Sequence, residues 1–235
     1  MKVTVVFDRE RLNDRLTGGW GLSFLLGEEV LFDTGEKAEY TLKNMEVLGV
    51  DINKIKKVVI SHNHWDHRQG LWGFIERRDD LEIFACRDFI EEFRSQLGNN
   101  KVKEVKAPQQ ISEGIYTIGG IRTLYEGKLI IEQFLVTKTA KGISLICGCS
   151  HPGILEVLEK VKETFPDDKI YSVIGGLHLM DSDKRFVEYV VKETKRIGVQ
   201  CVGPSHCSGF EAQELFKETY GNNFIDIKSG VEFQI

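Results

Sequence analysis

Three histidines and an aspartate fall within six consecutive positions, directly after a strand-like segment. The run Lys57-Val58-Val59-Ile60 predicts a short β-strand, and His62, His64, Asp66 and His67 follow it. Loop backbone beyond a strand end lets alternate side chains turn toward one point. Imidazole and carboxylate are ligands that Zn²⁺, Fe²⁺ and Mn²⁺ prefer. The segment therefore predicts a divalent-metal site, and a fold that presents a strand end to it.

The chain has six histidines, and the other three also follow strand-like segments. His151, His178 and His206 each lie beside glycine, cysteine or serine. Glycines Gly175 and Gly176 before His178 allow close approach of the backbone to a ligand. These three histidines are therefore further candidates for the same site.

Short apolar runs bounded by glycine or aspartate predict many strands, and helical periodicity appears between some of them. The predicted strands are about 2–7, 21–26, 29–32, 56–60, 81–85, 115–118, 129–136, 142–147, 169–174, 199–203 and 231–235. The predicted helices are 151–165 and 183–197, with weaker signals at 37–48, 88–97 and 210–220. This α/β pattern suits two sheets between helices and other layered arrangements equally well.

The composition is that of an ordinary globular protein. With 235 residues the chain fits a single domain, 1–235, with a lid or small insertion around 86–128. A net charge of −5 predicts no nucleic-acid partner, and no run predicts a signal peptide or a membrane span. Five cysteines without a disulfide-framework spacing favour reduced thiols and a cytoplasmic location.

The motif His62-x-His64-x-Asp66-His67 resembles the signature of the metallo-β-lactamase superfamily. Leu31-Phe32-Asp33-Thr34-Gly35 is similar to the early Asp-x-Gly turn of that superfamily, which implies that Asp33 stands behind the metal ligands and orients them. The resemblance implies an α+β fold, an αββα sandwich of two mixed sheets between helices.

A narrower likeness involves five further segments in order. They resemble the superfamily branch named after the methanopterin-pathway 7,8-dihydropterin-6-methyl-4-(β-D-ribofuranosyl)aminobenzene 5'-phosphate synthase. The segments are Gly21-Leu22-Ser23, Glu132-Gln133, Gly148-Cys149-Ser150-His151-Pro152-Gly153, Gly175-Gly176-Leu177-His178-Leu179 and His206-Cys207-Ser208-Gly209.

The resemblance implies two metal positions. His62 and His64 would join His151 at the first, and Asp66 and His67 would join His206 at the second. Superfamily members commonly place a bridging aspartate after a glycine here, but this chain has Cys149 after Gly148. Cys149 then either ligates as thiolate, which favours Zn²⁺, or leaves a weak second position or a single metal.

Two other residues near these motifs carry expectations of their own. His178 is predicted to be either a ligand or an acid/base facing the substrate. Cys207 is predicted to point away from the site.

These features predict a hydrolase in which one or two metals, Zn²⁺ first and Fe²⁺ or Mn²⁺ as alternatives, activate water against an ester or a phosphate-bearing small molecule. Asp66 would bind metal and orient that water. A transferase resembling the branch's namesake is the first alternative, because it would use the same ligands. A non-catalytic metal-binding or redox module is the second. The sequence predicts no oligomeric state.

Overall fold

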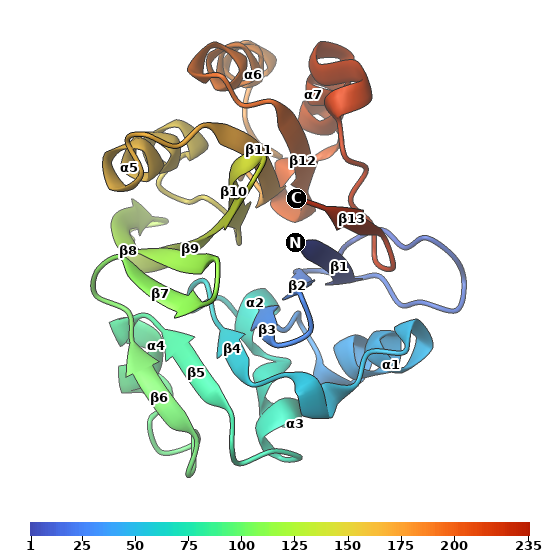
Figure 1. Cartoon of the computed structure of the whole chain (residues 1–235), viewed down its shortest axis with the longest axis vertical. Helices are drawn as coiled ribbons and strands as arrows, with labels where there is room; N and C mark the ends of the chain where they lie inside the picture. The colour runs from blue at the N-terminus through green and yellow to red at the C-terminus, as the bar shows by residue number, and fades with distance from the viewer.

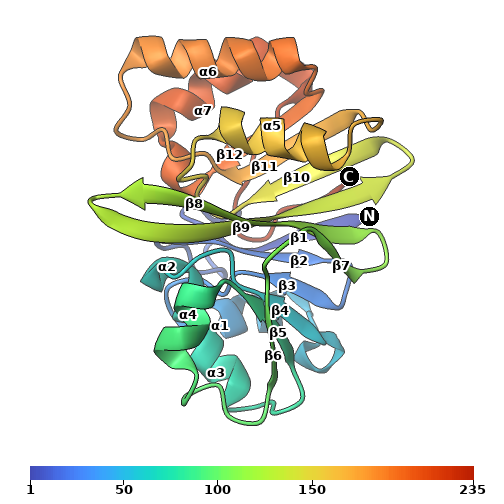
Figure 2. The same cartoon turned by 90° about the vertical axis from the view of Figure 1, so that its left-hand side faces the viewer.

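Two mixed β-sheets lie face to face in the computed structural model, which describes residues 1–235, and helices cover the outer face of each sheet (Figure 1 and Figure 2). The first sheet has the strand order β13-β1-β2-β3-β4-β5-β6, and the second has β12-β11-β10-β9-β8-β7. The predicted αββα sandwich is confirmed.

The first sheet is antiparallel from β13 to β3 and parallel from β3 to β6. The parallel half brings the carboxyl end of β4, which leads into the histidine-rich loop, to one edge. The strands are Lys2–Phe7 (β1), Ser23–Leu26 (β2), Val30–Phe32 (β3), Lys57–Val59 (β4), Glu82–Ala85 (β5), Lys101–Glu104 (β6) and Glu232–Gln234 (β13).

The second sheet is parallel from β10 to β12 and antiparallel from β10 to β7. The parallel strands end side by side, which places the residues after each of them at one edge. The strands are Gln109–Ser112 (β7), Ile115–Tyr125 (β8), Lys128–Thr139 (β9), Gly142–Cys147 (β10), Ile170–Gly176 (β11) and Cys201–Ser205 (β12).

Four helices cover the first sheet and three cover the second (Figure 2). The first group is Ala38–Leu48 (α1), Trp65–Arg68 (α2), Leu71–Ile75 (α3) and Arg87–Phe93 (α4), and the second is Ile154–Thr164 (α5), Lys184–Ile197 (α6) and Phe210–Tyr220 (α7). Three short 3₁₀ turns are Ile52–Lys54 (η1), His206–Ser208 (η2) and Gly221–Asn223 (η3).

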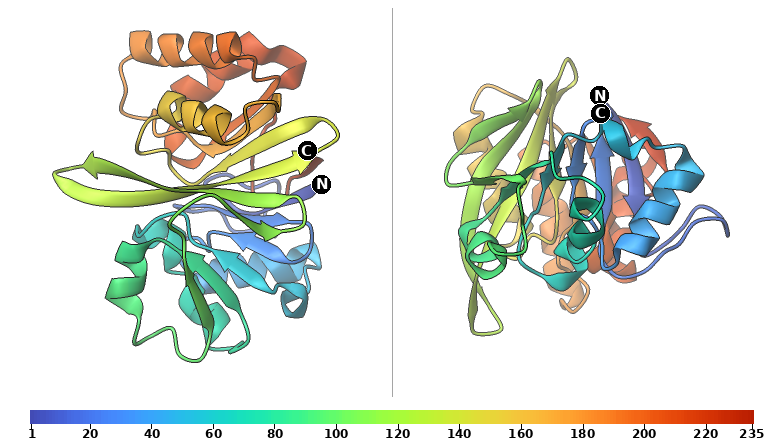
Figure 3. Two further views of the ribbon diagram at one scale, coloured as in Figure 1. Left: turned by 60° about the vertical axis from the view of Figure 1, so that its left-hand side comes forward. Right: turned by 90° about the horizontal axis from the view of Figure 1, so that it is seen from below.

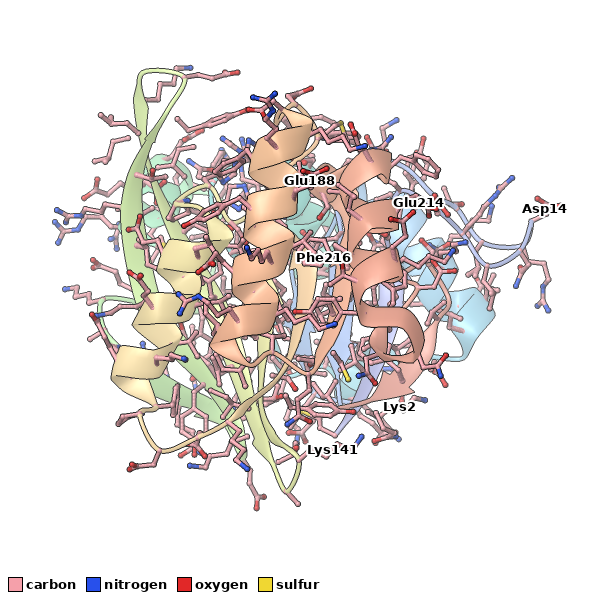
Figure 4. All side chains as sticks on the ribbon, turned by 90° about the horizontal axis from the view of Figure 1, so that it is seen from above. Lys2, Asp14, Lys141, Glu188, Glu214 and Phe216 are labelled. Atoms are coloured by element: carbon pink, nitrogen blue, oxygen red, sulfur yellow. The ribbon has the colours of Figure 1, made fainter.

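Helix α6 illustrates why these segments form helices. Asp183 caps its first turn by accepting a hydrogen bond from the backbone N–H of Phe186, and Gly198 ends it in a left-handed conformation. Val187, Val190 and other residues at helical spacing are buried. Figure 4 looks down onto α6 and its neighbour α7. None of the helices combines the length and the apolar character needed to cross a lipid bilayer.

Three hydrophobic clusters hold the layers together. The middle one lies between the sheets and includes Phe24 and Phe32 of the first sheet with Leu135 and Ile146 of the second. The others join each sheet to its helices. The two termini meet, since the N-terminal amino group donates to the carbonyl of Ile235. These shared cores support the proposal that 1–235 is a single domain.

The segment 86–128 contains α4 and three strands. Strands β6 and β7 did not stand out in the sequence, and they join the first and the second sheet respectively. Strand β8 runs to Tyr125, well beyond the predicted 115–118. The end of the β8–β9 hairpin projects from the sandwich on the same side as α2 (Figure 2 and Figure 3). The loop between β1 and β2, with Asp14, forms another edge of the molecule (Figure 4).

Candidate metal centre

All six histidines meet where strand ends of the two sheets face each other. The loop after β4 carries His62, His64 and His67, while His151, His178 and His206 follow β10, β11 and β12. Neighbouring imidazole rings have centroids 4.3–4.9 Å apart. The structure thus brings together every histidine that the sequence singled out.

The first group of donor atoms comes from His62, His64 and His151, whose ligand atoms lie within 4.8 Å of one another. His62 Nε2 and His64 Nδ1 are 3.0 Å apart. Two nitrogens of one tetrahedral ion at about 2.0–2.1 Å stand only slightly farther apart. The three rings therefore fit one small cation with little movement.

Asp33 organises this loop from behind. One of its oxygens accepts hydrogen bonds from Ser61 Oγ and His67 Nδ1, each at 2.7 Å, and the other accepts from the Ser61 backbone N–H. Because Ser61 Oγ donates to Asp33, it accepts from His62 Nδ1 at 2.8 Å. Nδ1 of His62 therefore carries the proton, and its Nε2 lone pair faces the centre.

Glu132 does the same for His151. This fully buried carboxylate of β9 accepts from His151 Nδ1 at 3.0 Å and from the backbone N–H groups of Cys149, Ser150 and His151, each at 2.8 Å. Burial works to raise the pKa of Glu132, but the hydrogen bond from His151 and those from the backbone outweigh it and lower the pKa.

The sequence placed Glu132-Gln133 in a family pattern without assigning either residue a role. The available signal was a carboxylate inside the apolar strand Leu129–Val136, because such a group is buried only with partners. Gln133 beside it donates from Nε2 to the carbonyls of Ile60 and Phe84 and so joins the two sheets behind the metal loop.

The second group of donor atoms contains Asp66, His67 and His206. Asp66 Oδ2 lies 3.5 Å from His67 Nε2 and 3.3 Å from His206 Nε2. Cys149 Sγ lies 3.2 Å from His67 Nε2, and it groups with donors of both metal positions. Cys149 thus occupies the place between the two positions.

His206 has a different environment from the other ligands. Its Nδ1 accepts a hydrogen bond from the backbone N–H of Gly21 at 3.2 Å, so the neutral ring carries its proton on Nε2, toward the centre. Gly21 can approach because a Cβ there would lie 1.9 Å from the Asp66 carbonyl oxygen. A metal bound at Nε2 must displace that proton.

Cys207 also belongs to the centre, and the prediction that it points away is wrong. Its Sγ groups with donor atoms of Cys149 and His206 within 4.8 Å and donates to the Cys149 carbonyl at 3.6 Å. The turn η2 after β12 directs the side chain inward, which a sequence pattern could not show. His178 lies alongside, grouped with Cys149 and His151.

Burial and neighbouring charges separate the pKa values of the ligands. Burial lowers the pKa of His64 to about 4, and burial with neighbouring imidazoles lowers the pKa of His62 well below its ordinary value. Burial also works to lower the pKa of His67, but the carboxylates of Asp66 and Asp33 outweigh it and raise the pKa to about 9. His67 therefore holds a second proton at neutral pH unless a metal replaces it.

Aromatic side chains surround the centre. The Tyr125 ring, at the end of the β8–β9 hairpin, lies 4.7 Å from His151 and 5.0 Å from His178, centroid to centroid. The Trp20 ring lies 5.2 Å from that of His206. Trp65 is 51% exposed. Tyr125 and Trp20 thus pack against histidines of the centre.

A cleft of about 380 Å³ opens beside the centre, between α5, α6 and the loop after β11. His151 and His178 form part of its wall. The rest is largely apolar and includes Leu155, Leu177, Leu179, Phe186 and Val190.

Comparisons with known proteins agree with this architecture. A family model for the metallo-β-lactamase superfamily matches residues 19–127. The 7,8-dihydropterin-6-methyl-4-(β-D-ribofuranosyl)-aminobenzene-5'-phosphate synthase of Methanocaldococcus jannaschii is 30% identical, over 97% of this chain and 94% of the synthase. The chain belongs to the metallo-β-lactamase superfamily.

Two further proteins are similar to this chain. A crystal structure described as a metal-dependent hydrolase of the β-lactamase superfamily has a TM-score of 0.87 and 29% identity, covering 100% of this chain and 99% of that one. Ribonuclease Z of Pyrococcus abyssi is 35% identical, but only over 31% of this chain and 25% of that protein.

The donor set fits the divalent metals that this superfamily typically binds. Three imidazoles converge at the first position, and two of them, His62 and His151, have a partner that directs a lone pair to the centre. The second position has Asp66 and His67, with a thiol where a bridging carboxylate is common.

Proposed function

We propose that this protein is a metal-dependent hydrolase that cleaves an ester or a phosphate-bearing small molecule. The observation that carries the proposal is the convergence of six histidines, Asp66 and Cys149 on one point beside an apolar cleft. Divalent metal there, Zn²⁺ with Fe²⁺ or Mn²⁺ as alternatives, would supply Lewis acidity and lower the pKa of water toward about 7.

Asp66 is the proposed group that orients the attacking water. Burial works to raise the pKa of Asp66, but the neighbouring imidazoles of His67 and His206 outweigh it and hold the pKa well below its usual range. The carboxylate is therefore ionised at neutral pH and can accept a hydrogen bond from water held between the two donor groups. This geometry orients the water toward a substrate in the cleft.

His178 is the proposed proton donor to the leaving group. Its ring forms part of the cleft wall, and its Nδ1 is buried without a hydrogen-bond partner. The neighbouring Cys207 side chain raises the pKa of His178, so the imidazole keeps a proton to higher pH. A protonated imidazole beside the bond that breaks is suited to general-acid catalysis.

The cleft supports a small-molecule substrate with an apolar part. Leucine, phenylalanine and valine side chains line it, and His151 and His178 of the metal centre form part of its wall. A larger hollow of about 450 Å³ between α6 and α7 has no histidine or cysteine in its wall. We therefore place the substrate beside the centre. The five free thiols support a reducing compartment, and we propose the cytoplasm.

The test is a panel of carboxylic, phosphate and diphosphate esters with the enzyme loaded with each candidate metal. Asp66→Ala should reduce kcat by about 10²–10⁴-fold, because both a ligand and the water-orienting group are lost. Asp14→Ala, at an exposed loop position, is the matched control and should leave kcat unchanged. Metal-dependent turnover near wild type in Asp66→Ala would contradict the assignment.

A group transfer is the second candidate, and the 30% identity to the dihydropterin synthase over most of both chains favours it. The same ligands would then serve to release diphosphate from a pterin diphosphate while the aminobenzene nitrogen attacks the pterin methyl carbon and loses a proton. Product analysis separates the two reactions. A hydrolase releases diphosphate at the same rate with and without the aminobenzene acceptor, whereas a transferase forms the coupled product and needs the acceptor.

A further inference from the structure

Three parallel strands end side by side at the metal centre, and the residues after them follow a pattern. Cys149 comes just after β10 and Cys207 just after β12, while the strand between them, β11, ends in Gly175-Gly176. The outer strands thus each lead into a thiol, and the middle strand leads into His178 after its two glycines.

Gly176 makes room for Cys207 Sγ and for the backbone of Cys149. A Cβ at this position would lie 2.8 Å from Cys207 Sγ and 3.1 Å from Cys149 Cα, and 2.1 Å from the Gly148 carbonyl oxygen. Real Cβ atoms do not approach backbone so closely, so only glycine is compatible with the observed positions. The Cys207 sulfur and the backbone that carries Cys149 therefore fill the space beside Gly176.

The donor atoms of Cys149, Cys207 and His206 lie within 4.8 Å of one another. All three residues are at most 6% exposed. Sulfurs bound to one tetrahedral Zn²⁺ at about 2.3 Å stand about 3.8 Å apart, so small side-chain movements suffice to close this set on one ion. His206 Nε2 is a buried polar atom without a hydrogen-bond partner, 3.3 Å from Asp66 Oδ2 of the second metal position.

We propose that Cys207 is a metal ligand, and that with Cys149 and His206 it makes the second metal position a thiolate-rich site for a thiophilic divalent cation such as Zn²⁺. Two thiolates supply the negative charge that a bridging carboxylate gives elsewhere, and soft sulfur favours Zn²⁺ over Mg²⁺ and Mn²⁺. As each metal–sulfur bond forms, an S–H bond breaks and its proton passes to solvent. The inference rests on the metal centre of the proposed function.

Cobalt titration tests the ligand directly, without any substrate. The full chain is stripped of metal in the presence of a phosphine reductant and titrated with Co²⁺, and the thiolate-to-cobalt charge-transfer band is recorded in the near ultraviolet. We expect this band to gain most of its intensity with the second equivalent. Cys207→Ser should remove about half of it, and the double variant with Cys149→Ser should remove all of it. Cys201→Ser and Cys86→Ser, at thiols outside the cluster, are the matched controls and should keep the whole band.

A full band in folded Cys207→Ser would overturn the proposal and leave the metal centre intact. A chain that binds no divalent metal would overturn both this inference and the proposed function. If Cys207→Ser does not fold, X-ray absorption at the zinc edge of the wild-type protein with one and with two equivalents of zinc decides, because the difference between the two spectra must show two sulfur neighbours for the ion bound second. A single sulfur neighbour, or a Cys149–Cys207 disulfide in the zinc-loaded protein, excludes Cys207 as a ligand.

Discussion

The two metal positions are built from buried imidazoles whose Nδ1 atoms meet different partners. His62 and His151 belong to the first position, and His206 belongs to the second. Ser61 and Glu132 accept from Nδ1 of the first two, which leaves both Nε2 lone pairs directed at the first metal position. The Gly21 N–H instead donates to Nδ1 of His206, so its proton faces the second position.

Protonation separates the two positions further. His62 and His64 are neutral at pH 7, because burial lowers their pKa values, whereas His67 has a pKa of about 9. A metal at the second position must therefore expel protons, and one at the first finds lone pairs ready. Ligands of the same type can therefore differ in affinity because of the groups that bond to their far ring nitrogens. We expect the first ion to bind more tightly.

Removing a ligand from either metal position should have the largest effect. His62→Ala deletes a ligand of the first position. It should lower the metal content to less than one ion per chain, because the first position binds its metal more tightly, and should lower kcat by about 10³-fold or more. His206→Ala should leave one tightly bound metal per chain. Elemental analysis after dialysis measures the metal content of both variants. Equal metal loss in the two variants would show that the positions are not different.

Glu132→Gln should weaken only the first position. The amide keeps the size of the side chain, but it cannot accept all four hydrogen bonds and loses the charge that orients His151. We expect a loss of about 10–100-fold in affinity for the first metal, and destabilisation by about 1–3 kcal/mol, since buried N–H groups lose a partner. Competition with a chelating dye gives the affinity, and thermal unfolding gives the stability. Glu126→Gln, at the hairpin tip, is the matched control for the same replacement.

The role of Glu132 could not be predicted from the sequence, whereas that of the histidine-rich loop could. The His62–His67 motif lies in one loop, so its spacing alone indicated a metal, and its resemblance indicated the sandwich and its second sheet. His151 and His206 could be placed beside it only through that resemblance, because about 84 and 139 positions separate them from His67 and local periodicity carries no long-range pairing.

The remaining features depend on tertiary structure. The inward turn of Cys207, the hydrogen bonds of Glu132 and the Gly21 contact with His206 all arise where distant strand ends meet. Strands β6 and β7 escaped prediction for a related reason. They lie at the edges of their sheets, and the exposed, charged residues of β6 give no apolar run to detect.

The two metal positions should also differ in how their affinity for metal depends on pH. Because His67 holds its second proton below pH 9 and each thiol that binds releases its own proton, affinity for the second metal should rise by at least about tenfold per pH unit from 7 to 9. Affinity for the first metal should change little above pH 6. Calorimetric titration in buffers of different ionisation enthalpy measures the affinities and the protons released. A second-metal affinity that is flat with pH would contradict the raised pKa.

The same raised pKa has a stability consequence for the metal-stripped protein. The folded pKa of His67 lies above its ordinary value of 6.5, so its contribution to the free energy of unfolding is fully present below pH 6.5 and is lost as pH rises through 9. Chemical denaturation with chelator should show stability falling over this range. His67→Gln should remove that dependence.

The smallest effect should come from Ser61, which links Asp33 to His62. Ser61→Ala removes the hydroxyl that accepts from His62 Nδ1 and donates to Asp33, but it keeps the backbone hydrogen bond from Ser61 N–H to Asp33. The His62 ring then loses the partner that sets its tautomer, and we expect the affinity for the first metal to fall by about tenfold. The second position should be unaffected, since His67 still donates directly to Asp33. Chelator competition with one and two equivalents of metal separates the two positions, and a larger loss at the second position would contradict the proposed role of Ser61 in orienting His62.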